Sequence, residues 1–229
     1  VRYLENIGVT EATTIAHGSG IGAQTAIDSG RAISEGALLG LYKFNKYKST
    51  EQKTDFNRLT IMESSDDKIA ELKRGANEGV ILAESVNMCR DMCNEPANGM
   101  TPSDMAEVAL TVAKAQNLKL KVLERPQMTE LGMGALLGVA QGSHEPPKFI
   151  IMSYEGDPDN QANNIGLLGK GITFDSGGLD IKSAAGMSTM KSDMSGGASV
   201  ISAMNAIGNL KPKINVTAIV PATENMPGG

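Results

Sequence analysis

Residues 169–182 read GKGITFDSGGLDIK and directly follow a short apolar run at 165–168. An apolar run of this length between turn-forming residues predicts a buried strand. Lys170 then lies at the carboxyl end of that strand, where α/β sheets place their ligand sites. The glycines allow tight backbone turns close to a bound group, and we expect Asp175 to lie on a loop between them. The segment therefore predicts a polar site at one edge of an α/β sheet.

The sequence around this segment alternates between helical and strand-like patterns, which predicts an α/β domain with a mixed sheet over residues 94–229. The expected helices are 102–116, 128–139 and 195–210, and the expected strands are 118–123, 149–154, 165–168 and 214–220.

Residues 1–65 look like the C-terminal part of a smaller α/β domain, with strands at 9–15 and 57–62 and a helix at 23–42. From residue 66 to 93 apolar residues recur at steps of three and four, which predicts one long helix linking the two domains. The expected fold is α/β: a partial N-terminal α/β domain, a linking helix, and the first part of a mixed-sheet domain.

The composition excludes some partners. The net charge is −5 with a pI near 5.2, and no dense basic run occurs, which argues against a nucleic-acid surface. The sequence has no apolar run of about 18 residues, so we expect no membrane span.

Cysteine and histidine are too sparse to complete a metal site by themselves. Cys89 and Cys93 are the only cysteines, four residues apart in the long predicted helix. We interpret them as a structural pair kept reduced in the cytoplasm, rather than half of a metal site or a redox pair. His17 and His144 lie in loop-like sequence far apart, so we expect both to be structural or on the surface.

Two lysines and two aspartates distinguish the segment that begins at Lys170: Lys170, Asp175, Lys182 and Asp193. They favour either a structural cluster of ion pairs or a site where carboxylate oxygens bind divalent cations. A lysine can ligate a metal only when neutral, so its pKa must fall well below the reference of about 10.4. Spacing alone leaves both interpretations open.

Two glycine patterns suggest phosphate or dinucleotide binding. Residues 166–171, GLLGKG, lack the spacing and the following Ser or Thr of a P-loop. Residues 18–23, GSGIGA, fit a dinucleotide-binding pattern, but we favour a tight strand-to-helix turn; the alternative requires NAD to shift the melting temperature. No serine-hydrolase elbow or HExxH helix occurs.

The motifs taken together resemble the cytosolic leucine aminopeptidase family over residues 85–229. The matching elements are GKGITFDSGGLDIK at 169–182, MKSDM at 190–194, GGA at 196–198, ENMP at 224–227, and NEPAN at 94–98 with the Thr-Pro pair at 101–102. Residues 94–229 would then be the first part of the catalytic domain, and residues 1–65 are compatible with the family's variable N-terminal domain.

The resemblance implies a role for each of five residues. Lys170, through a neutral amine, and Asp193 would ligate the same metal, and Asp175 would bridge two metals. Lys182 would remain cationic and face the scissile carbonyl of the substrate. Met190 would line the pocket for the substrate's first side chain.

The implied activity is two-metal hydrolysis that releases N-terminal, preferentially apolar residues from peptides, as in a leucyl aminopeptidase. Zn or Mn is expected first, and Mg or Co is also chemically compatible. The resemblance further implies a bicarbonate base in the full-length enzyme and a homo-hexamer with active sites facing inward.

One family element is missing from these 229 residues. A later NTDAEGR element supplies the remaining Asp and Glu ligands and an Arg that holds the bicarbonate. We therefore expect this polypeptide alone to be inactive, although its parent would be an aminopeptidase. The alternative is a catalytically dead subunit with a structural role.

Overall fold

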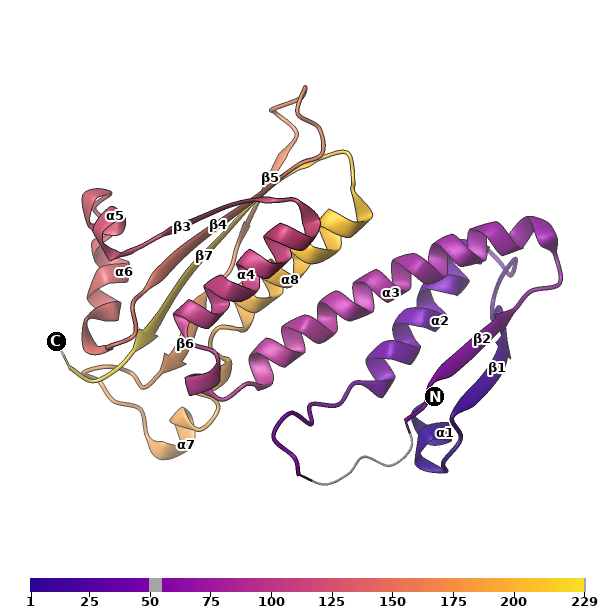
Figure 1. Cartoon of the computed structure of the whole chain (residues 1–229), viewed down its shortest axis with the longest axis horizontal. Coiled ribbons are helices and arrows are strands. Elements are labelled where there is room, and N and C mark those ends of the chain that lie inside the picture. The colour runs from indigo at the N-terminus through magenta and orange to yellow at the C-terminus, as the bar shows by residue number, and fades with distance from the viewer. Residues whose placement is uncertain (50–54, 229) are drawn as a thin grey trace. The chain divides into compact units, whose positions relative to one another are not determined.

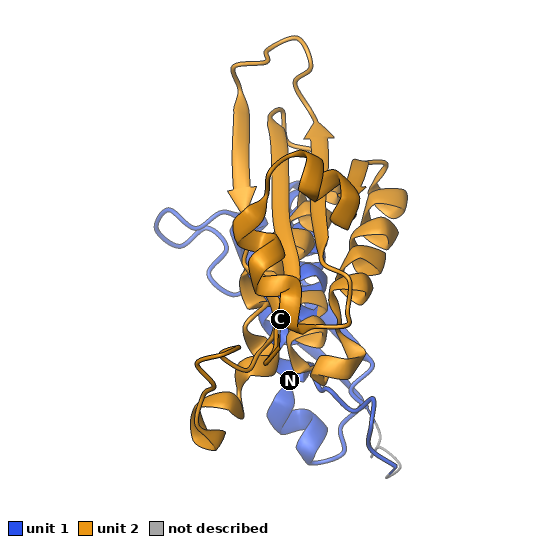
Figure 2. Ribbon diagram, turned by 90° about the vertical axis from the view of Figure 1, so that its left-hand side faces the viewer, with its two compact units in different colours: residues 1–87 blue, residues 88–229 orange. Residues whose placement is uncertain are grey.

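A computed structural model describes residues 1–49 and 55–228. The chain divides into two compact units, residues 1–87 and residues 88–229 (Figure 2). The boundary falls inside one continuous helix, α3 (Asp66–Asn94), close to the range expected for the linking helix. Within the described ranges, no helix is long and apolar enough to cross a membrane.

The first unit contains a parallel pair of strands and three helices. Its elements are α1 (Arg2–Asn6), β1 (Glu11–Ile15), α2 (Ala26–Leu41), β2 (Arg58–Met62) and most of α3. The GSGIGA segment forms turns between β1 and α2, as favoured from the sequence, with positive φ at Gly18, Gly20 and Gly22. Helix α2 begins later than expected because Thr25 and Asp28 form a reciprocal capping box there.

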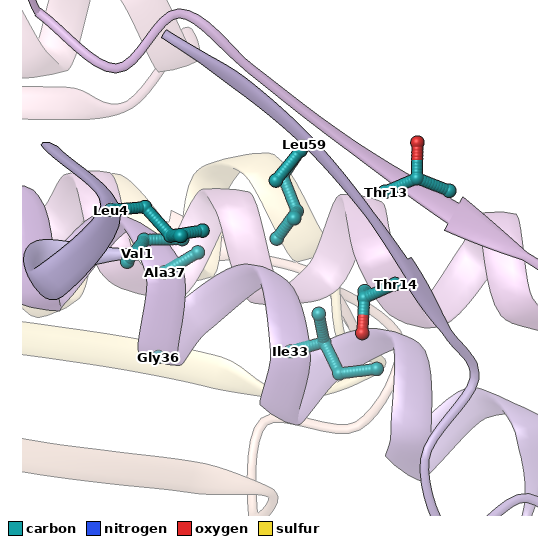
Figure 3. Close-up of a pocket in the computed structure, with 9 residues that line it drawn as sticks. Val1, Leu4, Thr13, Thr14, Ile33, Gly36, Ala37 and Leu59 are labelled. Carbon is teal, nitrogen blue, oxygen red and sulfur yellow. The ribbon is translucent and has the colours of Figure 1, made fainter. Parts of the chain in front are cut away.

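Glycines allow α2 and α3 to approach each other closely. A Cβ atom on Gly75 would overlap the carbonyl oxygen of Ile27, and one on Gly79 would overlap that of Arg31. Residues of α1, α2 and the two strands also line an open pocket of about 350 Å³, whose lining is apolar apart from two threonines (Figure 3). This lining offers no acid, base or charged side chain for chemistry.

The second unit is built on a mixed sheet, which confirms the expected fold class. Strands β3, β4 and β7 are antiparallel neighbours, and β5 and β6 both pair parallel with β7. The elements in chain order are η1 (Ala97–Gly99), α4 (Pro102–Gln116), β3 (Lys119–Leu123), α5 (Arg125–Glu130), α6 (Gly134–Val139), η2 (Ala140–Gly142), β4 (Lys148–Glu155), β5 (Asn164–Leu168), β6 (Gly171–Asp175), α7 (Ala184–Met187), η3 (Met190–Ser192), α8 (Ser195–Leu210) and β7 (Asn215–Asn225).

Helices α4 and α8 lie side by side and pack against the sheet (Figure 1). Alternate residues of β4 and β7 are buried in this core, including the paired residues Ile150 and Val220. Several methionines of the core, among them Met105, Met194 and Met204, are fully buried. Flexible thioether side chains therefore fill volume that aromatic rings fill in other proteins.

Two expectations from the sequence were wrong in detail, and two short helices were not expected. Asp175 is not in a loop: residues 171–175 form β6, because β7 extends to Asn225 and its last residues pair with them. The helix expected at 128–139 is two short helices, separated where Gly132 takes a positive φ. The short helices α1 and α7 were not expected, since segments of four or five residues carry little periodicity.

Candidate functional site

Lys170 lies at a break in one edge of the sheet. Strand β5 pairs with the first half of β7, and β6 pairs with its second half. Strands β5 and β6 therefore form one edge of the sheet, which is interrupted between them. At the break, Gly169 N donates to Ile219 O (3.0 Å) and Gly197 N donates to Lys170 O (2.7 Å). A Cβ on Gly169 would lie 2.5 Å from Gly196 O. Glycine is therefore required at this position by the close approach of α8, and not by a bound group.

Asp193 lies beside Lys170, between η3 and the start of α8. Its Oδ2 is 3.0 Å from Lys170 Nζ. That oxygen is buried, yet among the described residues it receives no aligned hydrogen bond. The preceding turn is fixed by Lys191 Nζ, which donates to Asn94 O at 2.6 Å. A buried carboxylate oxygen with an incomplete set of partners is a suitable ligand for a cation.

Asp175 ends β6 and has partners on both of its oxygens. Lys182 Nζ donates to Oδ2 at 2.8 Å, while Gly177 N at 3.0 Å and Asn225 Nδ2 at 2.6 Å donate to Oδ1. Burial raises the pKa of Asp175, but the hydrogen bonds from Lys182, Gly177 and Asn225 outweigh it and the net shift is downward. The carboxylate is therefore ionised near neutral pH.

The structure brings the four charged residues together as two ion pairs, Lys170 with Asp193 and Lys182 with Asp175. Strand β6, which carries Asp175, also contacts the η3 turn that precedes Asp193. The ion-pair cluster that the spacing allowed is thus present. Because the carboxylates and the incompletely paired oxygen of Asp193 are hard donors, the same residues also fit a divalent cation.

The described part of the chain offers few side chains that could bind a metal ion. No three His, Cys, Asp or Glu side chains come together there in a metal-binding arrangement. The carboxylates of Asp175 and Asp193 and the lysine amines are therefore the donors that this segment offers.

A cavity of about 770 Å³ adjoins the partners of Asp175. Gly177 and Asn225 line it, together with residues of α6 and the exposed side chain of Leu179. Met190, the residue expected to line a substrate pocket, is the half-buried first residue of η3. It lies on the turn that leads to Asp193.

Sequence reasoning missed the part played by Asn225. The ENMP motif drew attention to this position, but its contact with Asp175 follows from the register of β6 on β7. That register was not predictable, because residues 171–175 were not recognised as a strand.

The remaining candidates lie outside this group. His17 and His144 are exposed, in the first and second unit respectively. Both cysteines are unpaired thiols that contact serines of α8, Cys89 with Ser199 and Cys93 with Ser195.

Comparison with known proteins gives the family. A model of the catalytic domain of the cytosol aminopeptidase family matches residues 87–229. The chain belongs to the cytosol aminopeptidase family. Probable cytosol aminopeptidases of Alkaliphilus metalliredigens and Geotalea uraniireducens are 46% and 40% identical to it, over 87% and 99% of this chain. The matches cover 40% and 45% of those relatives, so the chain spans less than half of their length.

Two solved structures have a fold similar to that of this chain. The bottromycin maturation enzyme BotP in complex with Mn is 33% identical with a TM-score of 0.85, over 99% of this chain and 47% of BotP. A tomato leucine aminopeptidase mutant is 30% identical with a TM-score of 0.86, over 99% of this chain and 44% of that enzyme. The family assignment and the fold therefore agree.

Proposed function

We propose that the protein carrying this chain is a metal-dependent leucyl aminopeptidase that removes N-terminal, preferentially apolar residues from peptides. The observation that carries the proposal is the buried Asp193 Oδ2 beside Lys170, close to the strand that ends in Asp175. Family membership and the manganese complex of the similar protein BotP support it.

Each site residue has a proposed task. Lys170 and Asp193 would hold one divalent metal, and Asp175 would contribute to both. Two ions held there would supply an activated water molecule as nucleophile, a polarised peptide carbonyl and an anchor for the free α-amine of the substrate. Lys182, now paired with Asp175, remains cationic and stabilises negative charge that develops on the carbonyl oxygen. Met190 contributes apolar surface for the substrate's first side chain.

The test is the metal content of the natural full-length protein, measured after purification and again for Asp175→Ala. We expect about two divalent ions per subunit, Zn or Mn first and Mg or Co after reconstitution, and hydrolysis of leucine p-nitroanilide that a chelator abolishes. Asp175→Ala is expected to lose at least one ion and most of the activity. Equal metal content and activity in both proteins would refute the assignment.

The assembly and the base are also part of the proposal. We propose a cytoplasmic homo-hexamer in which bicarbonate acts as the base of the full-length enzyme. Light scattering of the full-length protein tests the hexamer, and the dependence of the rate on added bicarbonate tests the base.

A second candidate is a catalytically dead subunit with a structural role. The observation in its favour is that each aspartate of the site has a lysine partner, Lys170 for Asp193 and Lys182 for Asp175. It predicts a full-length protein that binds no divalent ion, hydrolyses no leucine p-nitroanilide and unfolds at the same temperature with and without Mn.

A further inference from the structure

Asn225 lies directly opposite Asp175 in the sheet. The two residues are register partners at the carboxyl ends of the parallel strands β6 and β7. Asn225 Nδ2 donates to Asp175 Oδ1 at 2.6 Å, and Gly177 N donates to the same oxygen at 3.0 Å. One oxygen of the carboxylate is thus held by two neutral donors, while the other faces the ammonium of Lys182.

Asn225 is itself fixed by the turn that follows β6. Its carbonyl oxygen accepts from Ser176 N at 2.9 Å and from Ser176 Oγ at 2.7 Å. Its side-chain oxygen lies against Gly178, where an added Cβ would be 2.6 Å away and where φ is +67°. Because backbone and side chain are both confined, the amide is directed at Asp175.

We propose that Asn225 is a positioning residue that fixes the orientation of the Asp175 carboxylate, so that Oδ2 is the oxygen presented to cations. The inference rests on the proposed function, in which Asp175 is a metal ligand. Hydrogen bonds from outside the ligand set commonly orient such ligands, and their loss typically lowers metal affinity about 10- to 100-fold.

The amide group suits this task better than other side chains. An amide nitrogen donates to a carboxylate without adding charge, whereas a carboxylate at position 225 would repel Asp175. A lysine or arginine there would donate as well, but its positive charge would oppose a nearby cation. An apolar side chain would leave Asp175 Oδ1 with Gly177 N as its remaining hydrogen-bond donor among the described residues.

The experiment compares Mn²⁺ binding to the natural full-length protein and to three variants, by electron paramagnetic resonance of free Mn²⁺. Asn225→Ala removes the donor, and Asp175→Ala removes the proposed ligand. Asn209→Ala is the matched control, because Asn209 is exposed and its amide donates to Asn205 O on the surface of α8. Each variant is also unfolded by heat in the presence of a chelator.

We expect Asn225→Ala to bind Mn²⁺ about 10- to 100-fold more weakly than Asn209→Ala. Without metal, its unfolding midpoint should stay within about 4 °C of the control, the shift for loss of one hydrogen bond. If Asn225→Ala does not fold, Asn225→Ser takes its place, because a serine hydroxyl is too short to reach Asp175.

The outcomes separate this inference from the proposed function. Equal Mn²⁺ affinity of Asn225→Ala and Asn209→Ala would overturn the positioning role. So would weaker binding that comes with a fall of more than about 4 °C in the metal-free midpoint, since Asn225 would then support the fold. Undiminished binding by Asp175→Ala would instead refute the ligand assignment on which the proposed function depends.

Discussion

Among single residues, Ser176 connects three parts of the candidate site. It is 3% exposed, its Oγ donates to Asn225 O at 2.7 Å, and its carbonyl oxygen accepts from Lys182 N at 2.8 Å. Gly178 N also donates to Ser176 Oγ at 3.2 Å. Ser176 therefore joins the end of β7, through its hydroxyl, to the turn that carries Lys182, through its carbonyl oxygen.

Ser176→Ala should lower the free energy of unfolding by about 1–2 kcal/mol, because the buried partners of the hydroxyl lose a hydrogen bond. Urea unfolding monitored by circular dichroism measures the change. The control is Ser188→Ala: the exposed Ser188 hydroxyl donates to Ala185 O at 3.0 Å, and its removal should change stability by less than about 0.5 kcal/mol. Equal effects of the two substitutions would contradict the role of Ser176.

The two cysteines should differ in reactivity. A hydrogen bond from Cys93 lowers the pKa of the Cys89 thiol to about 6, and the same contact, with burial, raises the pKa of Cys93. The thiolate is the reactive form, so we expect iodoacetamide to modify Cys89 first, with a rate that rises through about pH 6. Mass spectrometry of peptides labelled between pH 5 and 9 measures the labelling rate of each cysteine.

Removing the donor provides the control for the cysteine pair. Cys93→Ala should move the midpoint of Cys89 labelling upward, toward the reference value of about 8.5. Identical labelling profiles for Cys89 and Cys93 in the parent protein would show that the thiol pair does not share a proton in this way.

Among the elements, the edge formed by β5 and β6 depends on glycine at one position and not at another. A Cβ on Gly169 would meet the backbone of Gly196 and Gly197 in α8, whereas one on Gly166, in β5, would meet nothing within 4 Å. Gly169→Ala should therefore cost about 1–3 kcal/mol of stability. Gly166→Ala should stabilise by about 0.5–1 kcal/mol, since alanine is less flexible when unfolded. Chemical denaturation compares them, and equal effects would contradict the close approach of α8.

The same contrast applies to the two helices of the first unit. Gly75→Ala would force a methyl group against the backbone of Ile27, while Gly36 of α2 has open space around it. We expect Gly75→Ala to destabilise this unit by about 1–3 kcal/mol and Gly36→Ala to stabilise it by up to about 1 kcal/mol. Hydrogen exchange of the backbone amides of α2, measured in both variants, distinguishes the two effects. Similar protection in both variants would contradict the close packing.

The elements also show what the sequence could predict. Helix α4 was predicted to open at Thr101 and Pro102 and to run to about Gln116, and it spans Pro102–Gln116, because threonine before proline is a local start signal for a helix. Strand β6 was not predicted, because it begins with glycine and its stability comes from pairing with residues about fifty positions later in the chain. The candidate site shows the same difference between local and long-range information. Lys170, Asp175, Lys182 and Asp193 could be selected as candidate site residues from the sequence. Their pairing, and the contact of Asn225, required the three-dimensional register.

At the scale of the whole molecule, the 229 residues provide part of the donors that the family resemblance implies. They include Lys170, Asp175 and Asp193 but no NTDAEGR element, which would supply two further carboxylates and an arginine. In the described residues no other His, Cys, Asp or Glu completes a cluster of three. Two ions held by so few ligands would be weakly bound and loosely positioned.

We therefore expect the 229-residue polypeptide, with Mn or Zn added, to hydrolyse leucine p-nitroanilide no faster than buffer. The natural full-length protein, assayed beside it at equal concentration, should show turnover that a chelator abolishes. Circular dichroism of the polypeptide, compared with its helix and strand content here, excludes loss of folding as the cause. Chelator-sensitive turnover by the 229 residues alone would show that Lys170, Asp175 and Asp193 suffice, and the other ligands would then tune affinity rather than create the site.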